Sequence, residues 1–133
     1  MKTGKIYILQ LQSGNYYVGS TTDVNRRWAQ HTAGTGAAEC KRDKPVSTIH
    51  EFNTLLTENK LVLYIEDMIT LSIMLELGAS KVTGGRYLTT DYKRAKSDWI
   101  EAEYKRIVEA YEHSEYLTQD IRNKIAAAVA VVK

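Results

Sequence analysis

Polar and apolar positions alternate at the start of the chain and later change to a helical period. The segment KIYILQLQ (residues 5–12) places two isoleucines on one face of a strand and Tyr7 with two leucines on the other. SGN (13–15) is typical of a hairpin turn, and YYVGS (16–20) returns as a second strand. Gly19 in that strand indicates either a bulge or a close approach of the backbone. We therefore predict an antiparallel hairpin.

A helix and a third strand are expected after this hairpin. TTD (21–23) supplies hydroxyl and carboxylate groups that cap free backbone N–H groups, so a helix is predicted over residues 23–32. The glycines of AGTGAA (33–38) end it, and residues 41–45 form a basic loop. VSTIHEF (46–52) then alternates as a strand. The residues expected on one face of this strand are Val46, Thr48, His50 and Phe52.

The segment KLVLYIEDMITLSIMLELG (60–78) is apolar around most of a helical circumference, which predicts a long core helix. Thr57 or Asn59 is expected to cap its start, and Gly78 to end it.

An irregular stretch, SKVTGGRYLTTD (80–91), leads to the last helices. Thr90 or Asp91 is expected to cap a helical region over residues 92–113, and a second one follows over 116–132.

This order of elements predicts an α+β fold, with a small three-stranded antiparallel sheet flanked by helices and extra helices at the C-terminus. There is no alternating βαβ pattern and no glycine-rich phosphate loop before a helix, which argues against a doubly wound nucleotide-binding fold.

The composition narrows the possible classes of protein but does not identify a function. The chain has 133 residues, enough for one domain, with 44% apolar and 26% charged residues. A net charge of +2 does not indicate a nucleic-acid binder, and the basic clusters by themselves indicate solvated surface. One cysteine excludes an intrachain disulfide and fits a reducing compartment. No signal peptide or membrane-spanning run is recognisable, so we expect a cytosolic or intracellular protein.

Candidate chemistry begins with aromatic and basic residues near the hairpin. Tyr7 and Tyr17 lie on paired strands, either as an ordinary cross-strand pair or within reach of a shared ligand. Arg27 and His31 are four residues apart and share a helix face, suited to bracing a phosphate and moving a proton, or simply solvated. Arg26 points away and is the better candidate for a plain surface charge.

Glu66 is unusual because it lies midway along the apolar helix. A helical wheel places it on a narrow polar strip with Asn59 and Thr70. This strip either faces solvent or faces a cleft, where a carboxylate can hold a hard divalent cation. The sequence leaves both readings open.

The order of these motifs resembles the GIY-YIG nuclease superfamily. KIY (5–7) and, ten residues on, YVG (17–19) resemble its paired motif, and TTDVNRRWAQH (21–31) resembles the helix that follows. The spacing selects Arg27 rather than Arg26, together with His31. HTAGTGA and the Pro-Val pair that opens the third strand match its glycine loop and third strand.

The later segment EDMITLSIMLELGASKVTGGRY (66–87) resembles a branch of the superfamily with viral and phage members, and it selects Glu66 rather than Glu76 as the metal-binding residue. Two positions depart from the family pattern. Lys5 stands where the first glycine is usual, and Thr83 replaces an arginine of the tail, which weakens an expected phosphate contact.

The resemblance implies a metal-dependent DNA endonuclease that hydrolyses phosphodiester bonds with one divalent cation, Mg²⁺ or Mn²⁺. The expected catalytic residues are Tyr7, Tyr17, Arg27, His31 and Glu66, with Glu66 as the metal ligand; the residues expected to contact DNA are Gly19, Lys41 and Arg42. One tyrosine would be the general base, with Tyr7 favoured, while His31 would relay a proton or hold the phosphate.

The expected organisation is a nuclease core over residues 1–87 and a helical extension over 88–133 packed on the same domain. The expected partner is DNA, with no membrane, and a monomer or a homodimer is expected. The resemblance to viral and phage members also suggests a phage or viral origin, with action in the host cell. Two other functions compete with this one. The first is a non-catalytic nucleic-acid-binding module on the same fold, and the second is a structural protein whose tyrosines are merely strand residues.

Overall fold

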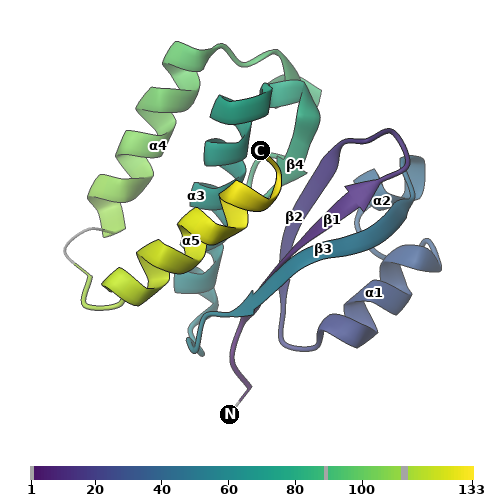
Figure 1. Ribbon diagram of the computed structural model, residues 1–133, viewed down its shortest axis with the longest axis horizontal. Coiled ribbons are helices and arrows are strands. Elements are labelled where there is room, and N and C mark those ends of the chain that lie inside the picture. The colour runs from purple at the N-terminus through teal and green to yellow at the C-terminus, as the bar shows by residue number, and fades with distance from the viewer. Residues whose placement is uncertain (1, 89, 112–113) are drawn as a thin grey trace.

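One sheet separates two groups of helices in the computed structural model, which describes residues 2–88, 90–111 and 114–133 (Figure 1). The strands are β1 (Lys5–Leu11), β2 (Tyr16–Thr21), β3 (Pro45–Asn53) and β4 (Val82–Gly84). The helices are α1 (Val24–Thr32), α2 (Ala38–Arg42), α3 (Asn59–Leu77), α4 (Ser97–Tyr111) and α5 (Gln119–Val131), with short 3₁₀ turns at Ala79–Lys81 and Thr90–Arg94. The α+β fold class is confirmed.

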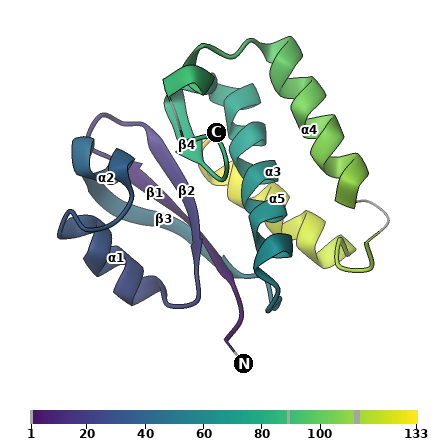
Figure 2. The ribbon, with the colours of Figure 1, turned by 180° about the vertical axis from the view of Figure 1, so that it is seen from behind.

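The predicted hairpin forms, and its alternation gives the sheet two different faces. β1 pairs antiparallel with β2 without interruption, so that Tyr7 lies opposite Gly19 and Leu9 opposite Tyr17. Ile6 and Ile8 face the long helix α3, whereas the tyrosines face α1 and α2. Figure 2 shows α3, α4 and α5 together on one side of the sheet and α1 with α2 on the other.

The sheet has four strands, in the order β3-β1-β2-β4, so the prediction of three was wrong. The fourth strand lies in the segment expected to be irregular, and it pairs parallel with β2 from Tyr16 to Val18. It is three residues long and is followed by a turn, so it has no alternation for a sequence pattern to detect. Its place in the sheet depends on packing against α3, a contact between distant parts of the chain.

Two further expectations around β3 are corrected. The basic loop expected over residues 41–45 is partly helical, because Lys41 and Arg42 end the short helix α2. The pairing of β3 with β1 shifts register between the partners of Ile8 and Leu9. This bulge sends Thr48 to the face that carries Tyr7, whereas Phe52 packs on the α3 side, so the four alternating residues do not share one face.

The core lies between the sheet and α3. The helix begins after Glu58, whose side chain makes no capping hydrogen bond, so neither predicted cap, Thr57 or Asn59, is used. It ends at Gly78 as expected, with a positive φ of 108°. Ile65, Ile69 and most of their neighbours along the helix are buried, which confirms α3 as the core element.

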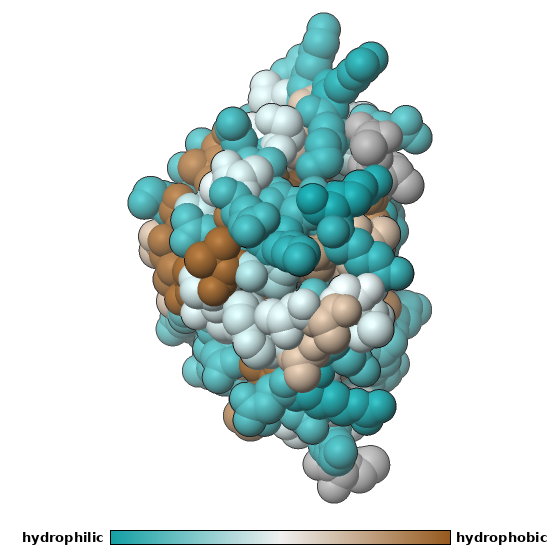
Figure 3. All heavy atoms as spheres, turned by 90° about the vertical axis from the view of Figure 1, so that its right-hand side faces the viewer, coloured by the Kyte–Doolittle hydropathy of each residue, from teal (hydrophilic) through white to brown (hydrophobic). Residues whose placement is uncertain are grey.

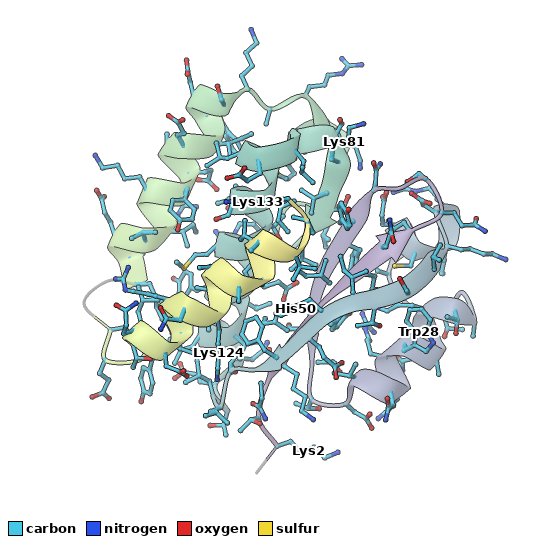
Figure 4. All side chains as sticks on the ribbon, in the orientation of Figure 1. Lys2, Trp28, His50, Lys81, Lys124 and Lys133 are labelled. Atoms are coloured by element: carbon cyan, nitrogen blue, oxygen red, sulfur yellow. The ribbon has the colours of Figure 1, made fainter. Side chains whose placement is uncertain are left out.

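The C-terminal helices are shorter than the sequence indicated. The first begins at Ser97 after a 3₁₀ turn, and the predicted end at His113 lies outside the described residues. The second is capped by the Thr118 hydroxyl, which accepts from the Ile121 N–H. α5 reaches the sheet, where Lys124 Nζ donates to the Asn53 carbonyl at 2.9 Å (Figure 4). Among the described helices, none has the length and apolar character needed to cross a bilayer.

Candidate active site

The hairpin brings two phenols together under α1. Tyr7 and Tyr17 are diagonal neighbours on β1 and β2, with ring centroids 6.3 Å apart, and both are buried. The His31 ring lies within 5.8 Å of one centroid and 5.4 Å of the other. The predicted proximity of the two tyrosines is therefore present, with a histidine packed against both.

Gly19 is explained by a close approach, not by a bulge. It lies directly opposite Tyr7 in an unbroken register. A Cβ atom added at Gly19 would overlap the Tyr7 hydroxyl and its ring. The absence of a side chain at this position is what lets the phenol lie across β2.

Helix α1 supplies the basic group. Asp23 caps it by accepting from the Arg26 N–H, which fixes the rotation of the helix above the sheet. Arg27 is half-buried beside the tyrosines, and its Nη1 donates to Gln30 Oε1 at 3.0 Å. The Arg27 Nε is buried without a hydrogen-bond partner among the described residues. Arg26 is exposed, as expected for a plain surface charge.

His31 is buried beneath Tyr7, not exposed toward a substrate. Its Nε2 lies 2.9 Å from the Tyr7 hydroxyl, and its Nδ1 accepts from the Ala37 N–H at 3.4 Å. A Cβ atom at Gly36 would overlap this ring, so the loop can approach His31 only because that residue is a glycine. An Nδ1 that accepts leaves the proton of the neutral ring on Nε2, which therefore donates to the Tyr7 oxygen.

Burial also keeps the imidazole neutral. Desolvation, followed by the positive charge of Arg27, lowers the pKa of His31 to about 4. Its position and neutral charge make it a donor to the phenol, while its Nδ1 accepts from the Ala37 N–H.

Glu66 reaches the same region from the opposite side of the sheet. It is buried, which excludes the solvent-facing reading, while Asn59 at the start of the strip is exposed. Ser20 Oγ donates to Glu66 Oε2 at 2.7 Å, and the Gly85 N–H donates to Oε1 at 3.1 Å. Neither donor was identified from the sequence; the only available signal was the position of Ser20 directly after Gly19.

The C-terminal end of β2 lies between the tyrosines on one face of the sheet and Glu66 on the other. Within the described residues, pairing with β4 stops where Val18 meets Gly84, so the following residues of β2 have no strand on that side. Glu66 contacts Ser20 at this open edge, one residue from the glycine that the Tyr7 hydroxyl crosses. A carboxylate, the Tyr7 phenol and the Arg27 guanidinium thus lie around one end of β2, with Tyr17 two residues before Gly19 on the same strand.

The electrostatics of the site agree with this arrangement. Desolvation raises the pKa of Glu66 to about 7, and the hydrogen bonds from Ser20 and Gly85 and the charge of Arg27 partly offset that effect. Desolvation raises the pKa of Tyr7 to about 12, with Arg27 opposing the shift and Glu66 adding to it. The pKa of Tyr17 is raised further, first by burial and then by Tyr7.

Glu66 also fits the requirements of a hard divalent cation. Each carboxylate oxygen accepts one hydrogen bond and retains capacity for another partner. No group of three or more His, Cys, Asp or Glu side chains that could hold a metal occurs in the described part of the chain. Mg²⁺ commonly keeps several waters and binds through one or two carboxylates plus substrate phosphates, so a single buried glutamate suits it.

A polar groove of about 280 Å³ borders this site. It is lined by Ser20, Arg27 and Gln30, together with Lys2, Asp23 and Arg26. Figure 3 views the molecule from the right-hand side of Figure 1, where α1 and α2 lie, and shows mainly hydrophilic and neutral side chains with some apolar ones among them. Two predicted DNA contacts, Lys41 and Arg42, lie elsewhere, exposed at the end of α2, where Arg42 pairs with Glu39 at 3.0 Å. No described contact joins them to the tyrosines.

Comparison with known proteins supplies the context of this site. Residues 3–67 match the family model of the GIY-YIG catalytic domain. A UPF0213 protein of Halobacterium salinarum is 44% identical over 45 residues, covering 34% of this chain and 58% of that protein. A UPF0213 protein of Cupriavidus pinatubonensis is 46% identical over 44 residues, covering 33% and 49%. Another, of Serratia proteamaculans, is 54% identical over 37 residues, covering 28% and 36%.

The chain thus spans about half the length of the relatives it matches, or less. Their names state no activity. No solved structure matches the chain significantly.

Proposed function

We propose that this chain, which belongs to the GIY-YIG superfamily through residues 3–67, is a metal-dependent DNA endonuclease. The observation that carries the proposal is the convergence of Tyr7, Arg27 and Glu66 at the open end of β2. A carboxylate can hold a metal ion, a guanidinium can stabilise charge on a phosphate, and a phenol can act as an acid or base, so together these groups can support phosphodiester hydrolysis.

In this proposal Glu66 holds the cation, Mg²⁺ or Mn²⁺, with water and substrate phosphate as the other ligands. When bound, the cation would neutralise charge on the scissile phosphate and stabilise the leaving 3′ oxygen. The hydrogen bonds from Ser20 and Gly85 fix the orientation of the carboxylate, as partners of a metal ligand usually do.

Tyr7 is the proposed general base. Its oxygen accepts from His31 Nε2 and lies beside Arg27, and both neighbours favour the phenolate, although burial outweighs them and raises the pKa of Tyr7 to about 12. Tyr7 would therefore act as the phenolate, after the charge of a cation held by Glu66 had lowered its pKa and its own proton had passed to solvent. Tyr17 lacks the contact with His31 Nε2, and burial raises its pKa further. We therefore assign Tyr17 to positioning water or phosphate, and His31 to holding Tyr7 in place.

Arg27 is proposed to stabilise the charge that develops on the phosphate. Its Nε is buried and has no hydrogen-bond partner in the part of the chain that the structure describes, and its guanidinium borders the polar groove through which a phosphate can enter. A guanidinium is planar and always charged, so it can brace two phosphate oxygens at once.

The proposed partner is DNA, and a single site of this kind cuts one strand at a time. A monomer would therefore nick a duplex, whereas a homodimer could cut both strands. An intracellular site of action and a phage-like or viral origin stay predictions, as does the division into a core over residues 1–87 and an extension over 88–133.

The test is nicking of supercoiled plasmid with and without Mg²⁺. We expect Mg²⁺-dependent nicking by the wild type and background activity for Glu66→Gln, with unchanged far-UV circular dichroism. Glu76→Gln is the matched control, because Glu76 lies on the same helix but is exposed and pairs with Lys133 at 3.4 Å. Undiminished nicking by Glu66→Gln would reject the assignment. Salt-sensitive DNA binding without any cleavage would instead favour a non-catalytic binding module.

A further inference from the structure

The turn that holds Glu66 lies outside the part of the chain that matches the family model. The Gly85 N–H donates to Glu66 Oε1, and the family match ends at residue 67. The turn runs from Gly84 to Tyr87, closed by a hydrogen bond of 2.8 Å from the Tyr87 N–H to the Gly84 carbonyl. Whatever fixes Tyr87 therefore also fixes the donor to the carboxylate.

Tyr87 is fixed by the C-terminal helices. Its side chain is 1% exposed, and its hydroxyl donates to Glu103 Oε2 on α4 at 2.7 Å. Glu103 is itself held by Arg106, whose Nε donates to Oε1 at 2.7 Å. The edges of the Tyr87 ring meet Tyr92 and Trp99, with centroids 5.2 and 6.3 Å apart. Helix α4 thus anchors the phenol at both its hydroxyl and its ring.

The turn is also anchored from α3. Asp67, the neighbour of Glu66, is 1% exposed and accepts from Arg86 N at 2.9 Å and from Arg86 Nε at 2.8 Å. Two successive carboxylates on α3 therefore bind two successive backbone N–H groups of the turn. The Gly85 N–H therefore reaches the Glu66 carboxylate only if the backbone of the turn keeps this conformation.

We propose that Tyr87 is a positioning residue, through which helix α4 sets the orientation of the Glu66 carboxylate for a divalent cation. The inference rests on the proposed function for its cation, but it assigns a role to residues that the family match does not cover. The C-terminal extension then completes the site, beyond covering the sheet.

The test compares Tyr87→Phe with the wild type, using Mn²⁺ as the probe in calorimetric titration without DNA. Loss of a partner that orients a metal ligand typically weakens metal affinity by about 10- to 100-fold, and we expect a change of about tenfold. A second readout needs no metal: hydrogen exchange of the Gly85 amide, followed by NMR, should become faster.

Tyr111→Phe is the matched control. Tyr111 is also 1% exposed and lies on α4, but its buried hydroxyl has no partner among the described residues. Its removal should change neither Mn²⁺ affinity nor Gly85 exchange. Glu103→Gln keeps an oxygen acceptor for the Tyr87 hydroxyl and should stay close to wild type, whereas Glu103→Leu should behave like Tyr87→Phe.

The outcomes separate this inference from the proposed function. Wild-type Mn²⁺ affinity and unchanged Gly85 exchange in Tyr87→Phe, with a wild type that binds Mn²⁺, would overturn the positioning role alone. A wild type that binds no Mn²⁺ would overturn the proposed function and this inference together. If Tyr87→Phe does not fold, Glu103→Leu gives the same comparison.

Discussion

The two faces of the sheet differ in what they bury. The face toward α3 belongs to a large apolar cluster that continues into α4 and α5. The face toward α1 and α2 buries only a small cluster, composed of Tyr7, Leu9, Leu11, Tyr17 and Cys40. His31 and Arg27 lie against this second cluster.

The comparison separates most of the stability from most of the chemistry, since Glu66 is the group of the candidate site that comes from the α3 side. Burial of apolar surface stabilises a fold roughly in proportion to its area, so most of the hydrophobic stabilisation comes from the α3 face. The α1 face buries polar groups that are costly to desolvate and that are only partly satisfied. Substitutions on the α1 face should therefore mainly lower the nicking rate, whereas those on the α3 face should mainly lower the free energy of unfolding.

The largest effect is expected on the α1 face, where Arg27→Ala should lower the nicking rate by about 10²- to 10³-fold. The reason is loss of the guanidinium that lies beside Tyr7 and lowers the pKa values of both Tyr7 and Glu66. Unfolding in urea should show little loss of stability. Arg26→Ala is the control, because Arg26 is exposed beside the same groove, so its removal takes away the same charge but leaves the half-buried Arg27 guanidinium in place. Equal losses in the two variants would mean that only general charge matters.

The opposite pattern is expected on the α3 face. Ile69 is fully buried, so Ile69→Ala should lower the free energy of unfolding by about 3 kcal/mol. The nicking rate per folded molecule should stay near wild type when measured well below the melting temperature. Leu63→Ala is the control, because Leu63 lies on the same helix at 40% exposure. A large loss of activity per folded molecule would show that the two faces are not independent.

An intermediate effect is expected where the tyrosine crosses the second strand. Gly19→Ala places a methyl group against the Tyr7 hydroxyl and must displace the phenol. A small misplacement of a reacting group can lower a rate by about 10²-fold, so we expect a loss of tenfold or more. The rate should fall with little change in Mn²⁺ affinity, because Glu66 is held by other partners. Wild-type nicking would remove Tyr7 from the site.

Regular patterns allowed the hairpin and its two faces to be predicted from the sequence. The pairing of β1 with β2 as a hairpin brought Tyr7 and Tyr17 together, and helical spacing distinguished Arg27 from Arg26. These relations depend only on the period of a strand or a helix, which local sequence determines.

Contacts between distant segments were not predictable in the same way. The burial of Glu66 depends on Ser20 and Gly85, which lie 46 and 19 residues away along the chain. The strand β4 has too few residues to show a period, and the bulge in β3 reverses the alternation after it. The basic cluster in the sequence did not indicate where the candidate site lies, because Lys41 and Arg42 lie away from the tyrosines.

The smallest effect tests the buried histidine of the α1 face by pH. Burial lowers the pKa of His31 to about 4, whereas an exposed histidine titrates near pH 6.5. Between these values the unfolded chain binds a proton that the folded protein does not, so the free energy of unfolding falls as pH decreases from about 6.5 to 4. From pH 7 to pH 5 we expect His31 to lower the free energy of unfolding by about 1 kcal/mol, allowing for solvent screening.

Urea unfolding at both pH values should show this extra loss in the wild type but not in His31→Gln, which retains an N–H donor for Tyr7. Equal pH dependence in the two proteins would mean that His31 is protonated in the folded state, and its Nδ1 could then not accept from Ala37.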